Sequence, residues 1–577
     1  MSLPSEGTVS TVALVDADLD AEVLVAGAGP VGCWLAAELA AAGVRVLVLE
    51  ARETRVNWSR GFIVHPRSLE IFESRGVAAP LVASGRRMPT WHFAMGSRRL
   101  DFTALPSSFP FVLLQPQART EELLEQHLNR SGGTVLRRQR VLDLTQHPDH
   151  VRVRVLHDGA ERTVTARFVV GCDGARSVVR QSAGIAFTGN PDTLVSPSAL
   201  VELADPPPPE QYMQTHEQGI FFAIPLPDGR FVVSTVDHAA MYDVGTPWTA
   251  EMVRASLVRI TGSDYGMGAA ERVSTLGNAA KQAERYREHR VLLAGDAAHV
   301  HFPMGGQGLN LGIQDAHDLA WRLIAAVRAE RGAAGAAGTA AAALPRAVAD
   351  LLDGYEAERR PVGERVLEDV RAQMALVAAT GADGTALRSR FNALLGEHPE
   401  VNLQYARRLS GLDVRYPGAG IDGAESDPRC GARVPDLELE LFDATTDTIA
   451  VADGREAASG EPSDGTRTQH LYPLLRTLGP GRFLWLTVGD PDGPTALPES
   501  DADAQHARPA EAADTGPETD GPLLGTPAAL AVRRVLGPDW ALRAGWGLGG
   551  SVLIRPDGHV AAVAAADADG VAAVAAA

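Results

Sequence analysis

The sequence predicts an α/β protein of three domains, in which the second domain interrupts the first. Three observations lead to this prediction. At 577 residues, the chain is longer than a single hydrophobic core organises. A strand–helix–strand pattern begins near residue 22, and an apolar strand of the same kind returns near residue 291 after a β-rich stretch. Further apolar strands follow residue 430.

The first predicted domain comprises residues 20–184 and 286–375. We expect a buried strand over residues 22–26, a helix that ends at Gly43, and a second strand over residues 44–50. The apolar runs RFVVGCDG and VLLAGD are further strands of the same kind, and a glycine-rich loop and a long helix follow the second run. The domain is therefore predicted to be discontinuous.

The second predicted domain, residues 185–285, is a β-sheet inserted into the first. Two short apolar strands on either side of PLPDGR indicate a hairpin. Residues 376–429 are predicted to be a helical connection. Residues 430–577 form the third predicted domain, also α/β, and its acidic, Pro- and Gly-rich stretch 491–524 is predicted to be a disordered loop.

Charge and composition exclude several classes of protein. The 53 basic and 72 acidic residues give a net charge of −19, and no basic run offsets it, so we expect no nucleic-acid partner. No apolar run is long enough to span a membrane. The acidic N-terminal stretch does not resemble a secretory signal or a transit peptide, so we expect a cytoplasmic protein.

The three cysteines, Cys33, Cys172 and Cys430, are far apart in the sequence and form no CxxC pair. Neither a structural zinc site nor a dithiol redox pair is expected from them. The pair His299 and His301 has no third ligand nearby, so we expect no metal there either. These two histidines are predicted to support the neighbouring glycine-rich loop through hydrogen bonds.

The first strand–helix junction carries the pattern G-x-G-x-x-G, formed by Gly27, Gly29 and Gly32, with Pro30 at the start of the helix. Such glycines permit a tight turn, a close approach of the backbone to a pyrophosphate, and close helix–strand packing. Glu50 ends the next strand, where a carboxylate can accept both hydroxyls of an adenosine ribose. An unphosphorylated ribose indicates FAD or NAD rather than NADP.

A second glycine-rich segment distinguishes between these two nucleotides. Asp296 closes the strand near residue 291, and Gly305, Gly306 and Gly308 precede the long helix. One carboxylate and a group of backbone N–H donors are thereby directed into one crevice. This arrangement suits the ribityl chain and the pyrimidine ring of a flavin.

Three motifs in order, GAGPVG at 27–32, GCDGARSVVR at 171–180 and GDAAHVHFPMGGQGLN at 295–310, resemble those of the FAD-dependent aromatic hydroxylases. These enzymes are the class A flavoprotein monooxygenases with the p-hydroxybenzoate hydroxylase fold. The resemblance covers about residues 20–370 and implies a Rossmann-like FAD-binding domain with an inserted substrate-binding sheet. A fainter resemblance of residues 430–577 implies a thioredoxin-like domain, which lacks the thiol pair and would have a structural or assembly role.

The resemblance also implies roles for individual residues. Gly27, Gly29, Pro30 and Gly32 would contact the FAD pyrophosphate, and Gly308 would belong to the flavin-binding loop. Pro303 would line the cavity where the substrate meets the flavin, and no catalytic side chain is implied. The remaining cofactor contacts would be Glu50 to the adenosine ribose, Arg60 near the pyrophosphate, Gln117 to FAD, Val141 through its backbone to the adenine, Asp173 with Arg180 to FAD and the nicotinamide nucleotide, Asp296 to the ribityl chain, and the backbone N–H groups of Leu309 and Asn310 to the flavin N1/O2 edge.

The implied activity is a monooxygenase that consumes NADPH or NADH together with O2. In the family, reduced nicotinamide gives hydride to FAD, and a flavin C4a-hydroperoxide transfers oxygen to an electron-rich aromatic ring. Two alternatives stay open: a Baeyer–Villiger or epoxidising flavin monooxygenase, and a flavin- or drug-binding protein without turnover. The sequence also leaves the oligomeric state open, with a homodimer among the possible states.

The predicted hairpin bears on the substrate. Alternation along GIFFAIP places Ile220, Phe222 and Ile224 on one face and Phe221 and Ala223 on the other. We expect the first set to face the cavity, although both faces could instead be packed core. No carboxylate clamp stands on this strand, which favours a large, mostly apolar aromatic substrate, such as a polycyclic polyketide in antibiotic biosynthesis, held by contact area rather than by charge.

Overall fold

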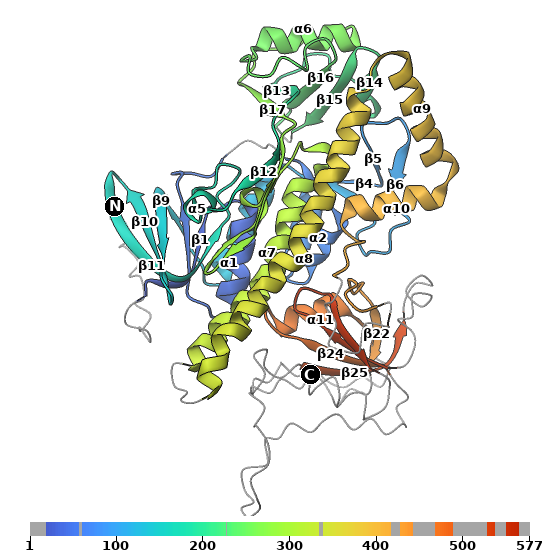
Figure 1. Cartoon of the computed structure of the whole chain (residues 1–577). Coiled ribbons are helices and arrows are strands. Elements are labelled where there is room, and N and C mark those ends of the chain that lie inside the picture. The colour runs from blue at the N-terminus through green and yellow to red at the C-terminus, as the bar shows by residue number, and fades with distance from the viewer. Residues whose placement is uncertain are drawn as a thin grey trace, which may run out of the picture.

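The computed structural model describes residues 19–56, 61–226, 228–333, 339–416, 427, 429–441, 468–488, 528–536 and 550–564. Figure 1 shows the sheet of β13 (Val195–Val201) to β17 (Arg272–Gly277) at one end of the molecule and the C-terminal sheet at the other, with a large mixed sheet and long helices between them. None of the helices in these ranges is long and apolar enough to cross a membrane. The predicted roles of Arg60 and of residues 491–524 lie outside the described residues.

The large sheet belongs to the first predicted domain and has eight strands. Its central strand, AEVLVA, is buried at every position, as a parallel strand covered on both faces requires. The two neighbours of this strand run parallel to it. Across the sheet the order is β19 (Arg287–Glu288), β20 (Val291–Leu293), β11 (Ala160–Gly171), β1 (Ala21–Ala26), β2 (Val46–Glu50) and β8 (Val135–Arg137), and β10 (Val151–His157) and β9 (Gln139–Gln146) extend it from β11.

The predicted strand–helix–strand unit is confirmed, and the later strand β20 pairs with β11 as part of the same sheet. The helix after β1 has Pro30 in its first turn and ends two residues before Gly43, which has a φ of +76°. It packs against two other helices of the first domain. The helices around this sheet are α1 (Pro30–Ala41), α2 (Pro66–Glu73), α3 (Ala78–Ser84), α4 (Gln117–Arg130), α5 (Val178–Ser182), α7 (Gln307–Ala333) and α8 (Thr339–Ala378).

The inserted sheet is antiparallel and has five strands. The hairpin predicted on either side of PLPDGR is confirmed, because Gly219 pairs with Asp237 and Pro225 with Phe231. One helix covers one face of the sheet and packs against Phe221 and Ala223. In order, the strands are β14 (Met213–His216), β15 (Gly219–Pro225), β16 (Phe231–Asp237), β13 (Val195–Val201) and β17 (Arg272–Gly277), the covering helix is α6 (Ala250–Thr261), and the short helix η1 (Pro209–Gln211) precedes β14.

Small sheets and further helices lie between the eight-stranded sheet and the inserted sheet. The 40-residue helix α8 runs beside α7 and continues toward the inserted sheet (Figure 1). The remaining elements are the sheet of β12 (Phe187–Asn190), β18 (Ala280–Ala283) and β21 (His299–Val300), the sheet of β3 (Ile63–Val64), β7 (Val112–Leu114) and β4 (Arg86–Met88), the pair β5 (Thr90–His92) and β6 (Arg99–Asp101), the helices α9 (Gly381–Glu397) and α10 (Pro399–Ser410), and the short helices η2 (Gly295–Ala297) and η3 (Met304–Gly306).

The C-terminal part is a six-stranded mixed sheet with one described helix. Its apolar core is formed by strands such as LWLTV and GSVLI and by the helix LYPLLRTL. That this part is thioredoxin-like stays a prediction. In order, the strands are β23 (Thr468–His470), β22 (Glu438–Leu441), β25 (Ala528–Leu536), β24 (Leu484–Val488), β26 (Gly550–Ile554) and β27 (Val560–Ala564), and the helix is α11 (Leu471–Leu478).

A buried ionic cluster joins the C-terminal sheet to the long helices. The Arg555 guanidinium donates to Asp318 of α7 (2.8 Å) and to both oxygens of Glu358 of α8 (2.8 Å each). It also donates to Asp557, and Arg322 donates to Asp318 and Glu358. We call these five residues the Arg555 cluster. Its three carboxylates converge as metal ligands do, but both arginines already supply positive charge to them.

Burial alone would raise the pKa of Glu358, but Arg555 and Arg322 outweigh that effect and lower the pKa to about 2. Asp318 behaves differently, because burial raises its pKa and the two other carboxylates add to that rise. The Arg555 side chain is only 4% exposed. Such a cluster is stable while every charge has a partner and is costly when one partner is removed.

Candidate active site

The glycine loop after β1 is shaped by contacts that leave no room for side chains. Gly27 has a φ of +99°, and a Cβ there would overlap the carbonyl oxygen of Cys172. A Cβ at Gly32 would overlap the carbonyl oxygen of Gly27 and lie 3.2 Å from its carbonyl carbon. A Cβ at Gly29 would meet nothing within 4 Å. The loop therefore has no space for a side chain at Gly27 and Gly32, where it packs against other backbone atoms. It has open space at Gly29, where α1 begins.

Glu50 lies at the carboxyl end of β2, beside this loop, and is 7% exposed. One of its oxygens accepts from the Ala28 N–H (3.1 Å) and the other from the Arg52 N–H (2.9 Å). A carboxylate oxygen has two lone pairs, so both oxygens can still accept hydroxyl hydrogens. Val141 is half-buried in β9, where it pairs with Val155 of β10.

The second motif supplies Asp173 and Arg180. One Asp173 oxygen accepts from the N–H groups of Val178 (2.7 Å) and Val179 (3.2 Å) at the start of α5. The other oxygen is buried and has no partner among the described residues, and burial raises the pKa of this carboxyl. Arg180 donates to the Ala297 carbonyl (2.8 Å), so the structure uses it to hold the third motif.

The third motif ends in the first turn of α7, which contains Gly308, Leu309 and Asn310. N–H groups in the first turn of a helix have no partner within the helix. The Asn310 side chain accepts from the His65 N–H (2.8 Å) and donates to the carbonyls of Ile63 (3.0 Å) and Gly306 (2.7 Å). Asn310 thereby fixes the loop before α2 against the third motif, a contact that its predicted backbone role did not include.

Three histidines in and around the third motif, His65, His299 and His301, make buried hydrogen bonds. The His65 Nε2 lies 2.8 Å from the Gly305 carbonyl, and burial lowers the pKa of His65 to about 4, so the ring is neutral. The His299 Nε2 lies 2.6 Å from Asp315, and the His301 Nδ1 lies 2.7 Å from the Phe302 carbonyl. Both histidines therefore make hydrogen bonds, but to Asp315 of α7 and to the neighbouring Phe302 rather than to the glycine-rich loop as predicted, and His65 is the one that bonds this loop, at Gly305.

The three motifs meet in space. Gly27 packs against Cys172 of the second motif, and Val31 packs against Gly295 of the third. The bond from Arg180 to Ala297 joins the second motif to the third. Asp296 is exposed in η2, at the end of β20. Gln117 begins α4, where its N–H donates to Gly61 (3.0 Å) and its side chain donates to Glu121 (2.7 Å).

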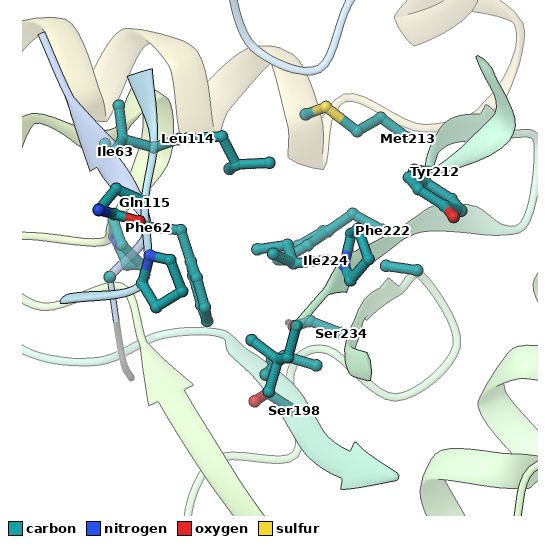
Figure 2. A pocket seen from close by; sticks show the side chains of 18 of the residues that line it. Phe62, Ile63, Leu114, Gln115, Ser198, Tyr212, Met213, Phe222, Ile224 and Ser234 are labelled. Atoms are coloured by element: carbon teal, nitrogen blue, oxygen red, sulfur yellow. The ribbon is translucent and has the colours of Figure 1, made fainter. Parts of the chain in front are cut away.

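A cavity of about 1220 Å³ lies between the third motif and the inserted sheet. Pro303 and the following loop line one side, as predicted for Pro303. Ile220, Phe222 and Ile224 line the opposite side, whereas Phe221 is fully buried beneath α6. Figure 2 shows Phe222 and Ile224 facing Phe62 across the cavity. Ile220, Phe222 and Ile224 therefore line the cavity as predicted, and Ala223, predicted on the other face, is also among the lining residues.

The cavity wall is more polar than the sequence predicted. The sheet contributes Ser198, Ser234 and Ser274 in addition to its apolar face (Figure 2 labels the first two). The strands β5 and β6 contribute His92 and Arg99, which sequence reasoning did not single out. These strands have three residues each, too few for a periodic pattern to identify the face they present.

Known proteins share this architecture. Residues 20–370 match a family model described as an FAD binding domain. The uncharacterized aromatic compound monooxygenase YhjG of Bacillus subtilis (strain 168) is 41% identical over 431 residues, which are 74% of this chain and 82% of that protein. A 12-dehydrotetracycline 5-monooxygenase/anhydrotetracycline 6-monooxygenase of Streptomyces rimosus is 39% identical over 435 residues, 74% of this chain and 82% of that protein.

The chain belongs to the FAD-dependent aromatic hydroxylase family. Among solved structures, the OxyS anhydrotetracycline hydroxylase from Streptomyces rimosus matches it with a TM-score of 0.73 and 34% identity, covering 94% of this chain and 96% of that one. The family resemblance predicted from the three motifs is confirmed.

The residues present fit the FAD that this family binds. Gly29 leaves open space at the start of α1, where a helix N-terminus favours phosphate. The buried oxygen of Asp173 is without a protein partner in the described part of the chain. Glu50, at the end of β2, retains acceptor capacity. Gly29 lies on the first motif, Asp173 on the second, and Glu50 at the end of the neighbouring strand β2, so one dinucleotide would contact all three residues.

Proposed function

We propose that the protein is an FAD-dependent monooxygenase that hydroxylates a large, polycyclic aromatic compound of the polyketide kind and consumes NADPH or NADH and O2. The observation that carries this proposal is the cavity of about 1220 Å³ beside the third motif. FAD would occupy the part of this cavity beside the third motif, and the part against the inserted sheet, lined by Ile220, Phe222 and Ile224, would offer an extended apolar face to an aromatic ring system. Relatives that oxidise tetracyclines support the same substrate class.

When bound, FAD would supply the redox chemistry by accepting hydride from the nicotinamide and delivering one oxygen atom of O2 to the ring. The protein would supply binding, orientation and exclusion of water. The N–H groups of Leu309 and Asn310 at the start of α7 would stabilise negative charge at the N1/O2 edge of the flavin. Pro303 and the loop after it would line the cavity at the reacting position.

Substrate binding would depend on the two facing walls of the cavity. Phe222 and Ile224 on one side and Phe62 on the other offer flat, apolar surfaces to a planar ring system (Figure 2). Each well-buried apolar side chain of this size contributes about 1.5–3 kcal/mol of transfer free energy. Ser198 and Ser274, which are both half-buried, would add hydrogen bonds to ring hydroxyls or carbonyls, whereas Ser234 is fully buried and already donates to the Pro197 carbonyl.

The purified protein is expected to be yellow, with one FAD per chain, and to oxidise NADPH or NADH faster when a polycyclic phenol is added. Mass spectrometry of the product should show one added oxygen atom. Insertion of that atom next to a carbonyl would instead favour the Baeyer–Villiger alternative. FAD binding without any substrate-dependent NAD(P)H oxidation would favour the flavin-binding protein without turnover.

Replacing Phe222 with arginine is expected to raise KM for the polycyclic substrate by roughly tenfold or more, because a charge replaces apolar contact area in the cavity. FAD content should stay unchanged. Val258→Arg, which places the same charge on the exposed face of α6, is the matched control and should leave KM unaltered. Efficient turnover of a small hydroxybenzoate, with polycyclic compounds inert, would contradict the proposed substrate class.

A further inference from the structure

The cavity contains a half-buried side chain, that of Arg99 of β6, whose positive charge no described residue neutralises. Its guanidinium makes no hydrogen bond or ion pair with any residue that the structure describes, and burial lowers its pKa without a carboxylate to oppose that effect. A partly desolvated cation without a partner is unfavourable in the empty protein.

Three other cavity-lining arginines are paired, whereas Arg86 and Arg176, which also line the cavity, are exposed to solvent. Arg55 lies 3.1 Å from Glu125, Arg119 lies 2.6 Å from Glu122, and Arg230 lies 2.6 Å from Asp228. In each of these pairs, a neighbouring carboxylate neutralises the charge of the arginine. Arg99 stands apart from them, and its donors are available to a ligand.

His92 stands beside Arg99. The two residues are directly opposite each other in the antiparallel pair of β5 and β6, so their side chains share one face. His92 is 4% exposed, and burial together with the Arg99 charge lowers its pKa to about 3, so the ring is neutral. Its Nδ1 accepts from the Met95 N–H (3.3 Å), which places the ring proton on Nε2.

No described residue accepts a hydrogen bond from the Nε2–H of His92. The pair therefore offers a planar guanidinium and a neutral N–H donor on one wall, and no acceptor. Donors of this kind match a planar anion with two oxygens. Two groups have that chemistry: a carboxylate, and an enolised 1,3-dicarbonyl or hydroxyquinone, in which one negative charge is shared by two oxygens across a conjugated system.

We propose that His92 and Arg99 form a specificity site for a planar two-oxygen anion carried by the ring system of the substrate. This inference rests on the proposed function, and it differs from the expectation that the substrate is held by contact area rather than by charge. The apolar faces of Phe222 and Ile224 would bind the rings, and the His92–Arg99 pair would select, among ring systems of similar size, those with an acidic oxygen pair.

The test measures binding to the oxidised, FAD-loaded protein by calorimetry, so it does not depend on turnover. The probes are 2-hydroxy-1,4-naphthoquinone, which is an anion at neutral pH, its neutral 2-methoxy ether, and 2-naphthoate. The native protein should bind the hydroxyquinone anion about ten- to a hundredfold more tightly than the ether, the range for a charge-assisted hydrogen bond. A similar preference for 2-naphthoate over the ether would identify a carboxylate as a second source of the same anion.

Arg99→Met should abolish the preference for the anion over the ether, and Arg99→Lys should retain part of it. Arg98→Met is the matched control, because Arg98 is the exposed neighbour outside the cavity lining, and it should keep the full preference. His92→Phe should reduce the preference and provides a second variant. An unchanged preference in Arg99→Met, or an equal loss in Arg98→Met, would overturn the proposal.

Thermal unfolding separates this role from a structural one. Because no described residue pairs with the Arg99 guanidinium, Arg99→Met should not lower Tm. A marked fall in Tm would mean that Arg99 holds the fold, and would overturn the assignment. Loss of the anion preference in a variant that still hydroxylates neutral aromatics would separate this inference from the proposed function.

Discussion

Replacing Arg555 with methionine is expected to destabilise the protein by about 3–5 kcal/mol, the range for breaking a buried ion pair from one side. The substitution leaves Asp318, Glu358 and Asp557 buried, with Arg322 as their remaining guanidinium in the cluster. Because the cluster joins the C-terminal sheet to α7 and α8, the sheet should also become sensitive to proteolysis. Thermal unfolding and limited proteolysis of the full chain measure both effects.

Arg476→Met is the matched control for this experiment. Arg476 also joins the C-terminal part to the first domain, through Glu73 at 2.7 Å, but its side chain is 47% exposed. An exposed pair contributes about 0–1 kcal/mol, so this variant should unfold close to the native temperature. Equal destabilisation by the two substitutions would show that the Arg555 cluster is not what holds the C-terminal sheet in place.

Replacing Gly32 with alanine is expected to cost about 4 kcal/mol or more, at the upper end of single substitutions. The new Cβ would overlap the Gly27 carbonyl oxygen, and because that atom belongs to the backbone, α1 must move away from β1. Both Tm and FAD content should fall. Differential scanning fluorimetry of the apoprotein and flavin absorbance of the purified protein measure the two effects separately.

Gly29→Ala tests the same loop with the opposite expectation. Its Cβ would meet no protein atom within 4 Å, and its φ of −73° suits alanine, so the Tm of the apoprotein should not change. If the open space holds the FAD pyrophosphate, this variant should nevertheless lose FAD affinity, by roughly tenfold or more for a backbone approach blocked by a methyl group. Normal FAD retention in Gly29→Ala would contradict the placement of the pyrophosphate.

The parts of the fold that sequence predicted are those with a strong local pattern. The buried run of β1, the turn at Gly27 and the alternation along β15 each fix a backbone conformation or a face from neighbouring residues alone. The meeting of the three motifs followed from the family resemblance rather than from any local pattern. Arg180 shows the limit, since its bond to Ala297 joins residues 117 positions apart.

The parts that sequence could not predict depend on distant partners. Arg555 reaches Asp318 across 237 positions, and nothing near either residue indicates the other. Arg99 and His92 lie opposite each other because two three-residue strands pair. Neither the Arg99 guanidinium nor the His92 Nε2–H has a partner among the described residues. A sequence shows which side chains are charged, but it does not show which of them have an oppositely charged partner in the folded protein. Only the folded arrangement distinguishes Arg99 from the paired arginines Arg55, Arg119 and Arg230 of the same cavity.

The strand order of the large sheet has a consequence for synthesis on the ribosome. β11 is completed on one side only when β20 emerges, about 120 residues later. The inserted sheet forms from nearer contacts and can fold in that interval, whereas the first domain keeps an unpaired strand edge exposed to aggregation. The third motif follows β20 directly, so the nascent chain cannot assemble the complete FAD site until residue 310 has left the exit tunnel.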